Sequence, residues 1–187
     1  MSSLPALAYR QRGVLVAVPL FISMFITWRE CENVPAVWIA AGIVFGLGVA
    51  IRIWSQQYLH YRLPIDKTLT TGGPYTVVRN PIYIGNTLIC IGIALASRVL
   101  WMVPISLLTC CLVYTFVVRF EEDGLSKRYG EPYLAYLREV PRWIPKLRNG
   151  AKLTWTKDYL GPSLVAEAHN LIFIIPPVLK ALVQRGL

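Results

Sequence analysis

Residues Leu69–Gly85 have the sequence LTTGGPYTVVRNPIYIG, a polar and turn-rich stretch between two hydrophobic segments. The pair Asn80-Pro81 predicts the start of a helix, because asparagine is a strong N-cap and proline is favoured at the first helical position. Just upstream, the triplet Gly72–Pro74 predicts a turn. The stretch is therefore expected to be a loop that ends at a helix start, and together with Arg119 and residues 121–123 it contains most of the side chains suited to chemistry.

Apolar segments long enough to cross a bilayer surround this stretch. A further segment near 160–183 is interrupted by Glu167, His169 and Asn170, and Pro176-Pro177 should kink it, which slightly favours a helix lying at the interface over a fifth span. We therefore expect an all-α, polytopic membrane protein with four to five transmembrane helices and a cytoplasmic helical cofactor-binding region. The four expected spans cover about 13–28, 34–54, 81–97 and 100–118.

Composition supports a membrane protein of one domain, residues 1–187, with 55% hydrophobic and only 16% charged residues. The formal net charge of +9 comes mainly from residues beside the apolar spans, as the positive-inside rule requires, so nucleic acid is not an expected partner. Cysteines form no Cys-x-x-Cys pair and no cluster with histidine, which predicts no metal site.

Loop charges predict the orientation in the membrane. The N-terminus, the loop 55–80 and the tail are basic, which places them in the cytoplasm of an integral protein of the cell inner membrane or the endoplasmic reticulum. The third and fourth spans then form a helical hairpin. This hairpin brings Leu69–Gly85 and the acidic residues after the fourth span to the same cytoplasmic face.

Two features inside the second span are interpreted as structural. Gly42, Gly46 and Ala50 form a stripe of small residues, with Gly48 nearby, that would let another helix approach closely. Arg52 lies near the end of the span, where a long side chain can reach the interface, so an anchoring role is favoured over a functional one.

The acidic cluster after the fourth span contains one residue without an obvious structural partner. Asp123 can pair with Lys127 at i+4, and Glu122 can pair with Arg119 at i−3. Glu121 is therefore our first choice for a functional acid.

Two motifs resemble those of a known group of enzymes. The segment Gly73-x-Tyr75-x3-Arg79-Asn80-Pro81-x-Tyr83-x-Gly85 is similar to the G-x-Y-x3-R-H-P-x-Y-x-G signature of the isoprenylcysteine carboxyl methyltransferase and phospholipid methyltransferase superfamily. The segment EEDGLSKRYGEPYLAYLREVPRWIP, residues 121–145, resembles the superfamily's E-E-x2-L-x3-F-G-x2-Y-x2-Y pattern. The two motifs occur in the expected order, and the resemblance covers about 53–145.

This resemblance implies a fold, a methyl donor and a set of site residues. The donor would be S-adenosyl-L-methionine, bound on the cytoplasmic side, and the acceptor would be lipophilic and enter from the bilayer. Asn80 replaces the family's usual histidine, which puts in doubt any role that needs a titrating imidazole. The implied cofactor contacts are His60, Lys67, Thr68, Leu69, Thr70, Tyr75, Asn80, Pro81, Ile82, Tyr83 and Glu121, and the candidate catalytic residues are Arg79, Glu121 and Glu122.

The chemistry of these side chains fits such a donor independently of the resemblance. The Arg79 guanidinium can bind a carboxylate through two hydrogen bonds, and Glu121 can accept from an ammonium or from ribose hydroxyls. Tyr75 and Tyr83 can face a sulfonium through cation–π attraction. Structural interpretations exist for each residue, since Asn80 is also a helix cap and the tyrosines also suit a membrane interface.

The sequence predicts an S-adenosylmethionine-dependent methyltransferase with a lipophilic acceptor, most like isoprenylcysteine carboxyl O-methylation. A phospholipid amine and a small thiol are alternative acceptors. A sterol-reductase-like NADPH-dependent oxidoreductase of the membrane is the alternative reaction. Membrane lipids are the expected partners, and the sequence does not set the oligomeric state.

Overall fold

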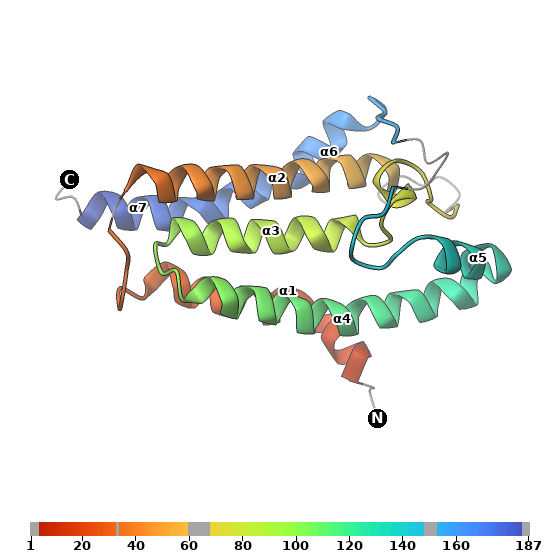
Figure 1. Ribbon diagram of the computed structural model, residues 1–187, viewed down its shortest axis with the longest axis horizontal. Helices are drawn as coiled ribbons and strands as arrows, with labels where there is room; N and C mark the ends of the chain where they lie inside the picture. Colours follow the sequence, from red (N-terminus) through yellow and green to blue (C-terminus); the bar gives the residue numbers. More distant parts are fainter. Residues whose placement is uncertain (1–3, 33, 60–67, 148–152, 185–187) are drawn as a thin grey trace.

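The computed structural model describes residues 4–32, 34–59, 68–147 and 153–184, and these residues form helices and loops without a strand. Figure 1 shows α2, α3 and α4 side by side along the long axis, with η1 and α5 at one end. The prediction of an all-α protein is confirmed for this part of the chain. The helices are α1 (Leu4–Phe25), α2 (Pro35–Leu59), η1 (Gly73–Thr76), α3 (Pro81–Ala96), α4 (Met102–Tyr129), α5 (Glu131–Glu139), α6 (Leu160–Glu167), η2 (Ala168–Ile174) and α7 (Ile175–Gln184).

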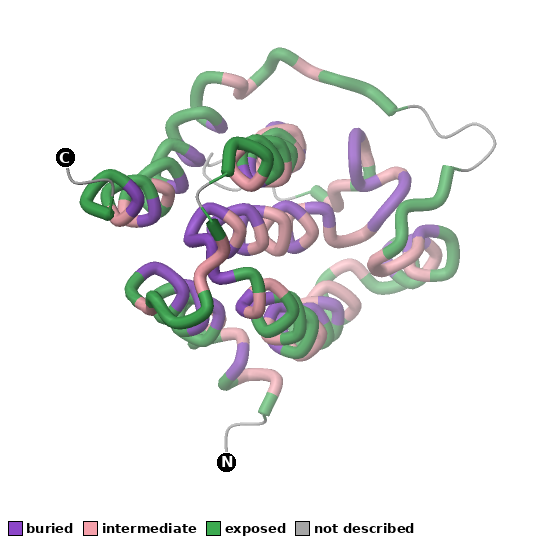
Figure 2. The backbone as a smooth tube through the Cα atoms, turned by 60° about the vertical axis from the view of Figure 1, so that its left-hand side comes forward, coloured by how far each residue is buried: buried purple, intermediate pink, exposed green. Residues whose placement is uncertain are grey.

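Three helical segments of the described chain are long and apolar enough to cross a membrane: α2, α4 and the continuous run Leu160–Gln184. The helix α3 is apolar but has only 16 residues, and α1 is not among the three. Large apolar side chains such as Phe21, Ile39 and Leu108 are exposed on the outer faces of the helices. Figure 2 shows this arrangement, with the exposed residues facing outward and the buried ones facing the bundle interior. An outer surface of this kind suits lipid as its solvent.

Local sequence explains where α4 ends and α5 begins. The helix α4 continues eleven residues beyond the expected end at 118, because Glu, Leu, Lys and Arg are good helix formers. It stops at Gly130, whose positive φ of 61° suits glycine, and α5 begins at the next residue. The acidic cluster therefore lies on the last turns of a long helix.

The α2–α3 contact depends on small residues, but not on the predicted ones. A Cβ atom at Gly48 would lie 2.8 Å from the Gly85 carbonyl oxygen and from the Ile89 nitrogen, so the two backbones touch there. In the described part of the chain, no neighbouring atom lies within 4 Å of a Cβ placed at Gly42 or Gly46. The prediction of a packing stripe is therefore wrong at Gly42 and Gly46 for the contacts among the described residues. The backbones of α2 and α3 cross instead at Gly48, which lies on a different face of α2 from Gly46.

Candidate active site

The start of the Leu69–Gly85 stretch is folded against the end of α2. Gly73 has a φ of 57°, and a Cβ atom there would lie 2.4 Å from the ring of Tyr58. Glycine is required for both reasons, since other residues rarely adopt this φ and none would fit beside the ring. Thr70 is anchored at the same place, where its hydroxyl donates to the Tyr58 carbonyl oxygen at 3.2 Å.

Backbone hydrogen bonds join this stretch to the chain that follows α5. The Arg79 amide donates to the Pro141 carbonyl at 2.9 Å, and the Lys146 amide donates to the Val77 carbonyl at 3.0 Å. The Tyr136 hydroxyl donates to the Tyr75 carbonyl at 2.8 Å. The two motifs that are separated by a helical hairpin in the sequence therefore form one structural unit at one end of the bundle.

Asn80 occupies the predicted N-cap position of α3, but its side chain does not cap the helix. Its Nδ2 donates instead to the Arg142 carbonyl oxygen at 3.2 Å, and Pro81 is the first helical residue as predicted. The expectation of a side-chain cap is wrong, because the amide forms a tertiary contact in its place. Asn80 thus helps to hold the Pro141–Pro145 segment over the start of α3.

Glu122 is the centre of a buried ion cluster. Its carboxylate accepts two hydrogen bonds from Arg142, at 2.5 Å and 3.2 Å, and Arg79 Nε lies 3.5 Å from its Oε1. The Glu122 side chain is 9% exposed and that of Arg79 is 12% exposed. The predicted pairing of Glu122 with Arg119 is wrong, since α4 turns this carboxylate toward the two arginines supplied by the motifs.

Glu121 has a different environment from its neighbour. Its Oε1 accepts a hydrogen bond from the Tyr83 hydroxyl at 2.7 Å, and Arg12 of α1 lies 4.0 Å away. The Glu121 side chain is 31% exposed, so part of it faces outward from the helix bundle. The expectation that Glu121 has no ion-pair partner is wrong, since Arg12 of α1 approaches it, but its carboxylate is more exposed than that of Glu122.

Two tyrosines of α5 complete the wall behind the ion cluster. Burial raises the pKa of Tyr133, and the negative charge of Glu122 raises it further. Burial also raises the pKa of Tyr136, so its hydroxyl stays protonated and keeps donating to Tyr75. With Val140 they form a small apolar cluster against which Leu69 packs.

The remaining predicted contacts are placed as follows. Thr68 is exposed, Pro81 is fully buried and Ile82 is half-buried. His60 and Lys67 lie outside the described residues, so their predicted roles stay predictions. Sequence reasoning did not select Arg142 as a site residue, although its place in the second motif, directly after Val140-Pro141, was the available signal.

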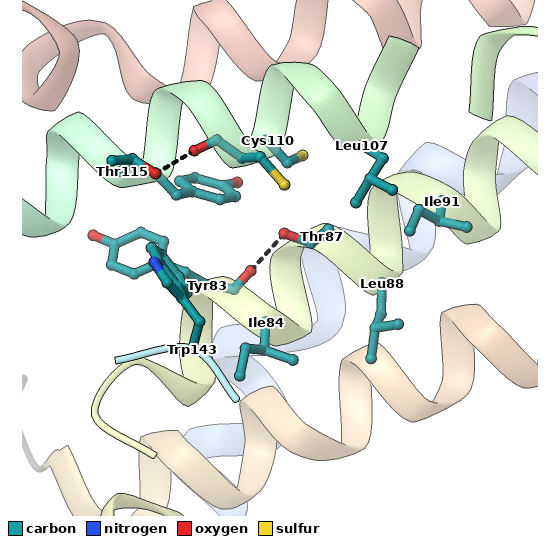
Figure 3. A pocket seen from close by; sticks show the side chains of 11 residues that line it. Tyr83, Ile84, Thr87, Leu88, Ile91, Leu107, Cys110, Thr115 and Trp143 are labelled. Carbon is teal, nitrogen blue, oxygen red and sulfur yellow. Dashed lines mark hydrogen bonds between the residues drawn. The ribbon is translucent and has the colours of Figure 1, made fainter. Parts of the chain in front are cut away.

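An apolar groove of about 470 Å³ lies between α3 and α4 and reaches the ion cluster end at Tyr83. Figure 3 shows Trp143 beside Tyr83 at that end, with Leu107 and Ile91 toward the other end. Cys111 on α4 is exposed, so the groove is open along the outer face of the bundle. Among the described residues, no charged side chain lines it; the lining residues are Tyr83, Ile84, Thr87, Leu88, Ile91, Leu107, Cys110, Cys111, Tyr114, Thr115 and Trp143.

Comparison with known proteins gives one family and two relatives. The sequence model described as phospholipid methyltransferase matches residues 33–132. The cobalt-zinc-cadmium resistance protein CzcN of Cupriavidus metallidurans is 30% identical over 158 residues, which cover 73% of this chain and 70% of that protein. The nickel-cobalt-cadmium resistance protein NccN of Alcaligenes xylosoxydans xylosoxydans is 31% identical over 157 residues, which cover 72% and 71%. No solved structure matches the chain significantly.

Proposed function

The chain belongs to the phospholipid methyltransferase family, as its two motifs indicated, and we propose on this premise that it methylates a lipophilic acceptor with S-adenosylmethionine as donor. Family membership favours methyl transfer over the nicotinamide-dependent reductase alternative. The observation that carries the proposal is the meeting of two features at Tyr83. Its ring lines the apolar groove, and its hydroxyl donates to Glu121 beside the buried ion cluster.

The described residues fit the donor at the cluster end. Two arginines and one glutamate leave the Arg79–Glu122–Arg142 cluster with a net charge of +1, and the buried Arg79 Nε has no hydrogen-bond partner among the described residues. This excess positive charge suits the carboxylate of the methionine part, bound by Arg79. Glu121 is placed to accept from the ammonium or the ribose. Thr68, Leu69, Thr70 and Tyr75 stand as further proposed contacts, and the bound donor would supply an activated methyl group.

The groove would bring the acceptor to that methyl group. An uncharged groove that is open along the bundle suits an apolar chain that enters from lipid. The reacting end of that chain would lie beside Tyr83 and Trp143, at one end of the groove. Holding both reactants at one point supplies much of the rate enhancement of such a transfer, and covering the site excludes water. These are the tasks that we assign to Tyr83, Trp143 and the Pro141–Pro145 segment.

The absence of an imidazole at position 80 favours one class of acceptor. A carboxylate or thiolate acceptor needs no general base, whereas an ammonium must first lose a proton. Asn80 cannot take that proton, and its amide already contacts the Arg142 carbonyl. We therefore favour an acidic acceptor group, as in isoprenylcysteine carboxyl O-methylation. A small thiol ranks next and a phospholipid amine last.

The membrane arrangement is part of the proposal. We propose four to five spans, in which α1 and α3 cross together with α2 and α4, the segment Leu160–Gln184 is the fifth where it crosses, and the ion cluster lies on the cytoplasmic face. Arg79, Arg142 and the basic tail support this orientation through the positive-inside rule. The names of the two relatives suggest that the methylated product serves in metal resistance. Among the described residues, no group of three or more His, Cys, Asp or Glu side chains could hold a metal ion, so we assign no metal site.

Transfer of tritiated methyl groups tests the proposal. Purified protein in lipid nanodiscs, given labelled S-adenosylmethionine and a lipid extract, should move label into the organic phase. Glu121→Gln is the matched inactive control. Absence of labelled lipid from the wild-type reaction, combined with absence of donor binding in calorimetry, would overturn the proposal.

A further inference from the structure

Arg12 of α1 lies just beyond the end of the apolar groove that Tyr83 and Trp143 form. The Tyr83 ring lines the groove, and its hydroxyl donates to Oε1 of Glu121 at 2.7 Å. Nη1 of Arg12 lies 4.0 Å from the same oxygen atom. Glu121 also follows Tyr114, another lining residue, by about two helical turns on the same face of α4. The groove therefore points toward a carboxylate that Arg12 approaches as well.

Contacts with Tyr9 and α4 hold the Arg12 side chain in this place. Its Cζ lies 4.3 Å from the centre of the Tyr9 ring, and its Nη1 donates to the Tyr9 carbonyl oxygen at 3.3 Å. The Tyr9 ring packs in turn on Phe120, the neighbour of Glu121, with 5.0 Å between the ring centres. Among the described residues, Arg12 makes no other hydrogen bond. Because its side chain is 41% exposed, most of its five N–H groups remain available to a ligand.

A buried arginine on α2 shows the contrasting case of a committed guanidinium. Arg52 donates to both oxygens of Glu167 at the end of α6, at 2.5 Å and 3.0 Å. Its side chain is only 13% exposed, so the anchoring role predicted for Arg52 at the membrane interface is wrong. Arg142 is bound by a carboxylate in the same way. Within the described chain, Arg12 forms no such hydrogen bond to a carboxylate.

The charges at the end of the groove also favour an anionic acceptor. Three arginines and two glutamates meet there, which gives a net charge of +1; they are Arg12, Arg79, Arg142, Glu121 and Glu122. The donor would add two positive charges, on its ammonium and sulfonium groups, and one negative charge, on its carboxylate. An anionic acceptor reduces this excess of positive charge, whereas an ammonium acceptor increases it.

We propose that Arg12 is a specificity-determining residue of the acceptor site, and that it binds a carboxylate at the reacting end of an acceptor whose apolar chain lies in the groove. This inference rests on the proposed function, and it selects the carboxylate among the acceptor groups considered there. A planar guanidinium donates two parallel hydrogen bonds to the two oxygens of a carboxylate, and a thiolate has only one acceptor atom. Arg12 precedes residues 33–132, which match the family, so this contact comes from a segment outside the match.

Methyl transfer would weaken the contact that binds the acceptor. A carboxylate oxygen forms a bond to the methyl carbon while the bond from that carbon to sulfur breaks, and the electron pair of the broken bond stays on sulfur. The acceptor becomes a neutral methyl ester, and the sulfonium becomes a neutral thioether. Hydrogen bonds to a charged group are stronger than those to a neutral one, so Arg12 binds the acid more tightly than the ester and favours release of the product.

The test compares the acid and the ester of one chain, palmitate and methyl palmitate, as protectants of the groove thiol Cys111. Modification by N-ethylmaleimide is followed by peptide mass spectrometry of the whole protein in detergent, with Cys31 as the internal reference outside the groove. A buffer of about pH 8 keeps the carboxylic acid ionised. In the wild type, palmitate should protect Cys111 at about tenfold lower concentration than methyl palmitate. Arg12→Gln should abolish this preference, because protection by palmitate weakens while protection by the ester does not change.

Arg10 supplies the matched control, since it is an exposed arginine two positions away on the same helix. Arg10→Gln removes the same charge from α1 and should keep the preference for the acid. Arg12→Lys keeps the charge but loses the planar pair of donors, so it should keep only part of the preference.

Three results would overturn the inference: equal protection by both probes in the wild type, a full preference that survives in Arg12→Gln, or an equal loss of preference in Arg10→Gln. The readout needs neither the donor nor methyl transfer, so the two proposals can fail separately. A preference that depends on Arg12, without labelled lipid in the transfer assay, refutes only the proposed reaction. Labelled lipid without a preference for the acid refutes only the role of Arg12.

Discussion

The neighbouring acids of α4 provide the sharpest experiment, because Glu121→Gln and Glu122→Gln make the same chemical change in two environments. Glu122 is buried between Arg142 and Arg79, whereas Glu121 accepts from Tyr83 and lies 4.0 Å from a partly exposed Arg12. We expect Glu122 to be needed for folding and Glu121 for donor binding. Glu122→Gln should therefore fail in an unfolding assay, and Glu121→Gln should fail in a donor-binding assay.

The expected magnitudes follow from these contacts. Glu122→Gln leaves the buried Arg79 and the partly exposed Arg142 without a counter-charge, and breaking a buried pair in this way costs about 3 kcal/mol of folding free energy. Glu121→Gln keeps an oxygen to accept from Tyr83 and loses only a weak, partly exposed attraction to Arg12, which costs less than about 1 kcal/mol. The same change removes a charged acceptor from the donor, so donor affinity should fall by about tenfold to a hundredfold.

Thermal unfolding in detergent and calorimetric titration with S-adenosylmethionine measure the two effects separately. Glu122→Gln should lower the midpoint of unfolding clearly, whereas Glu121→Gln should leave it nearly unchanged and weaken donor binding by about tenfold to a hundredfold. The reasoning is refuted if Glu121→Gln binds the donor like the wild type. It is equally refuted if Glu122→Gln unfolds at the wild-type temperature.

Three further predictions concern single contacts. Arg79→Lys should weaken donor binding about tenfold in the same calorimetric titration, because a lysine cannot reproduce the planar donor fork; wild-type affinity would contradict the role. Gly48→Ala should destabilise the protein by about 1–3 kcal/mol through overpacking at the α2–α3 crossing, while Gly46→Ala should not, and equal unfolding midpoints would count against this crossing. Cys111→Trp should partly fill the groove and raise the acceptor KM about tenfold without changing donor affinity, and an unchanged KM would place the acceptor elsewhere.

Much of the fold follows from local rules that the sequence displays openly. Apolar runs and the Asn80-Pro81 start each depend on a few neighbouring residues, so the helices α2 and α3 lie close to where they are expected and α4 begins close to its expected start. The face that a helix presents to its neighbour is not local information. Gly46 and Gly48 are equally small, and only the approach of α3 decides that Gly48 is the contact.

The candidate site was likewise predicted in part, with its motif residues identified and its ion-pair partners missed. The motifs identified Tyr75, Arg79, Tyr83 and Glu121, because these residue types recur at fixed spacing in the superfamily. Ion-pair partners were mistaken where spacing along one helix was the only guide. Glu122 lies one turn from Arg119, yet it pairs with arginines 43 and 20 positions away, which the folded loop brings to it.

In the C-terminal segment, polar residues lead to different inferences for a helix in water and for a helix in lipid. In water Glu167 and Asn170 would argue against a buried helix, and this argument favoured a position at the interface. Helices in lipid gain little from apolar contact with one another, so polar contacts supply much of what holds them in register. Glu167 binds Arg52 near one end of the segment, and Lys180 pairs with Glu30 near the other. The residues that interrupt the apolar run are therefore the ones that attach it to the bundle. A polar residue in such a run is better interpreted as a residue that contacts another helix.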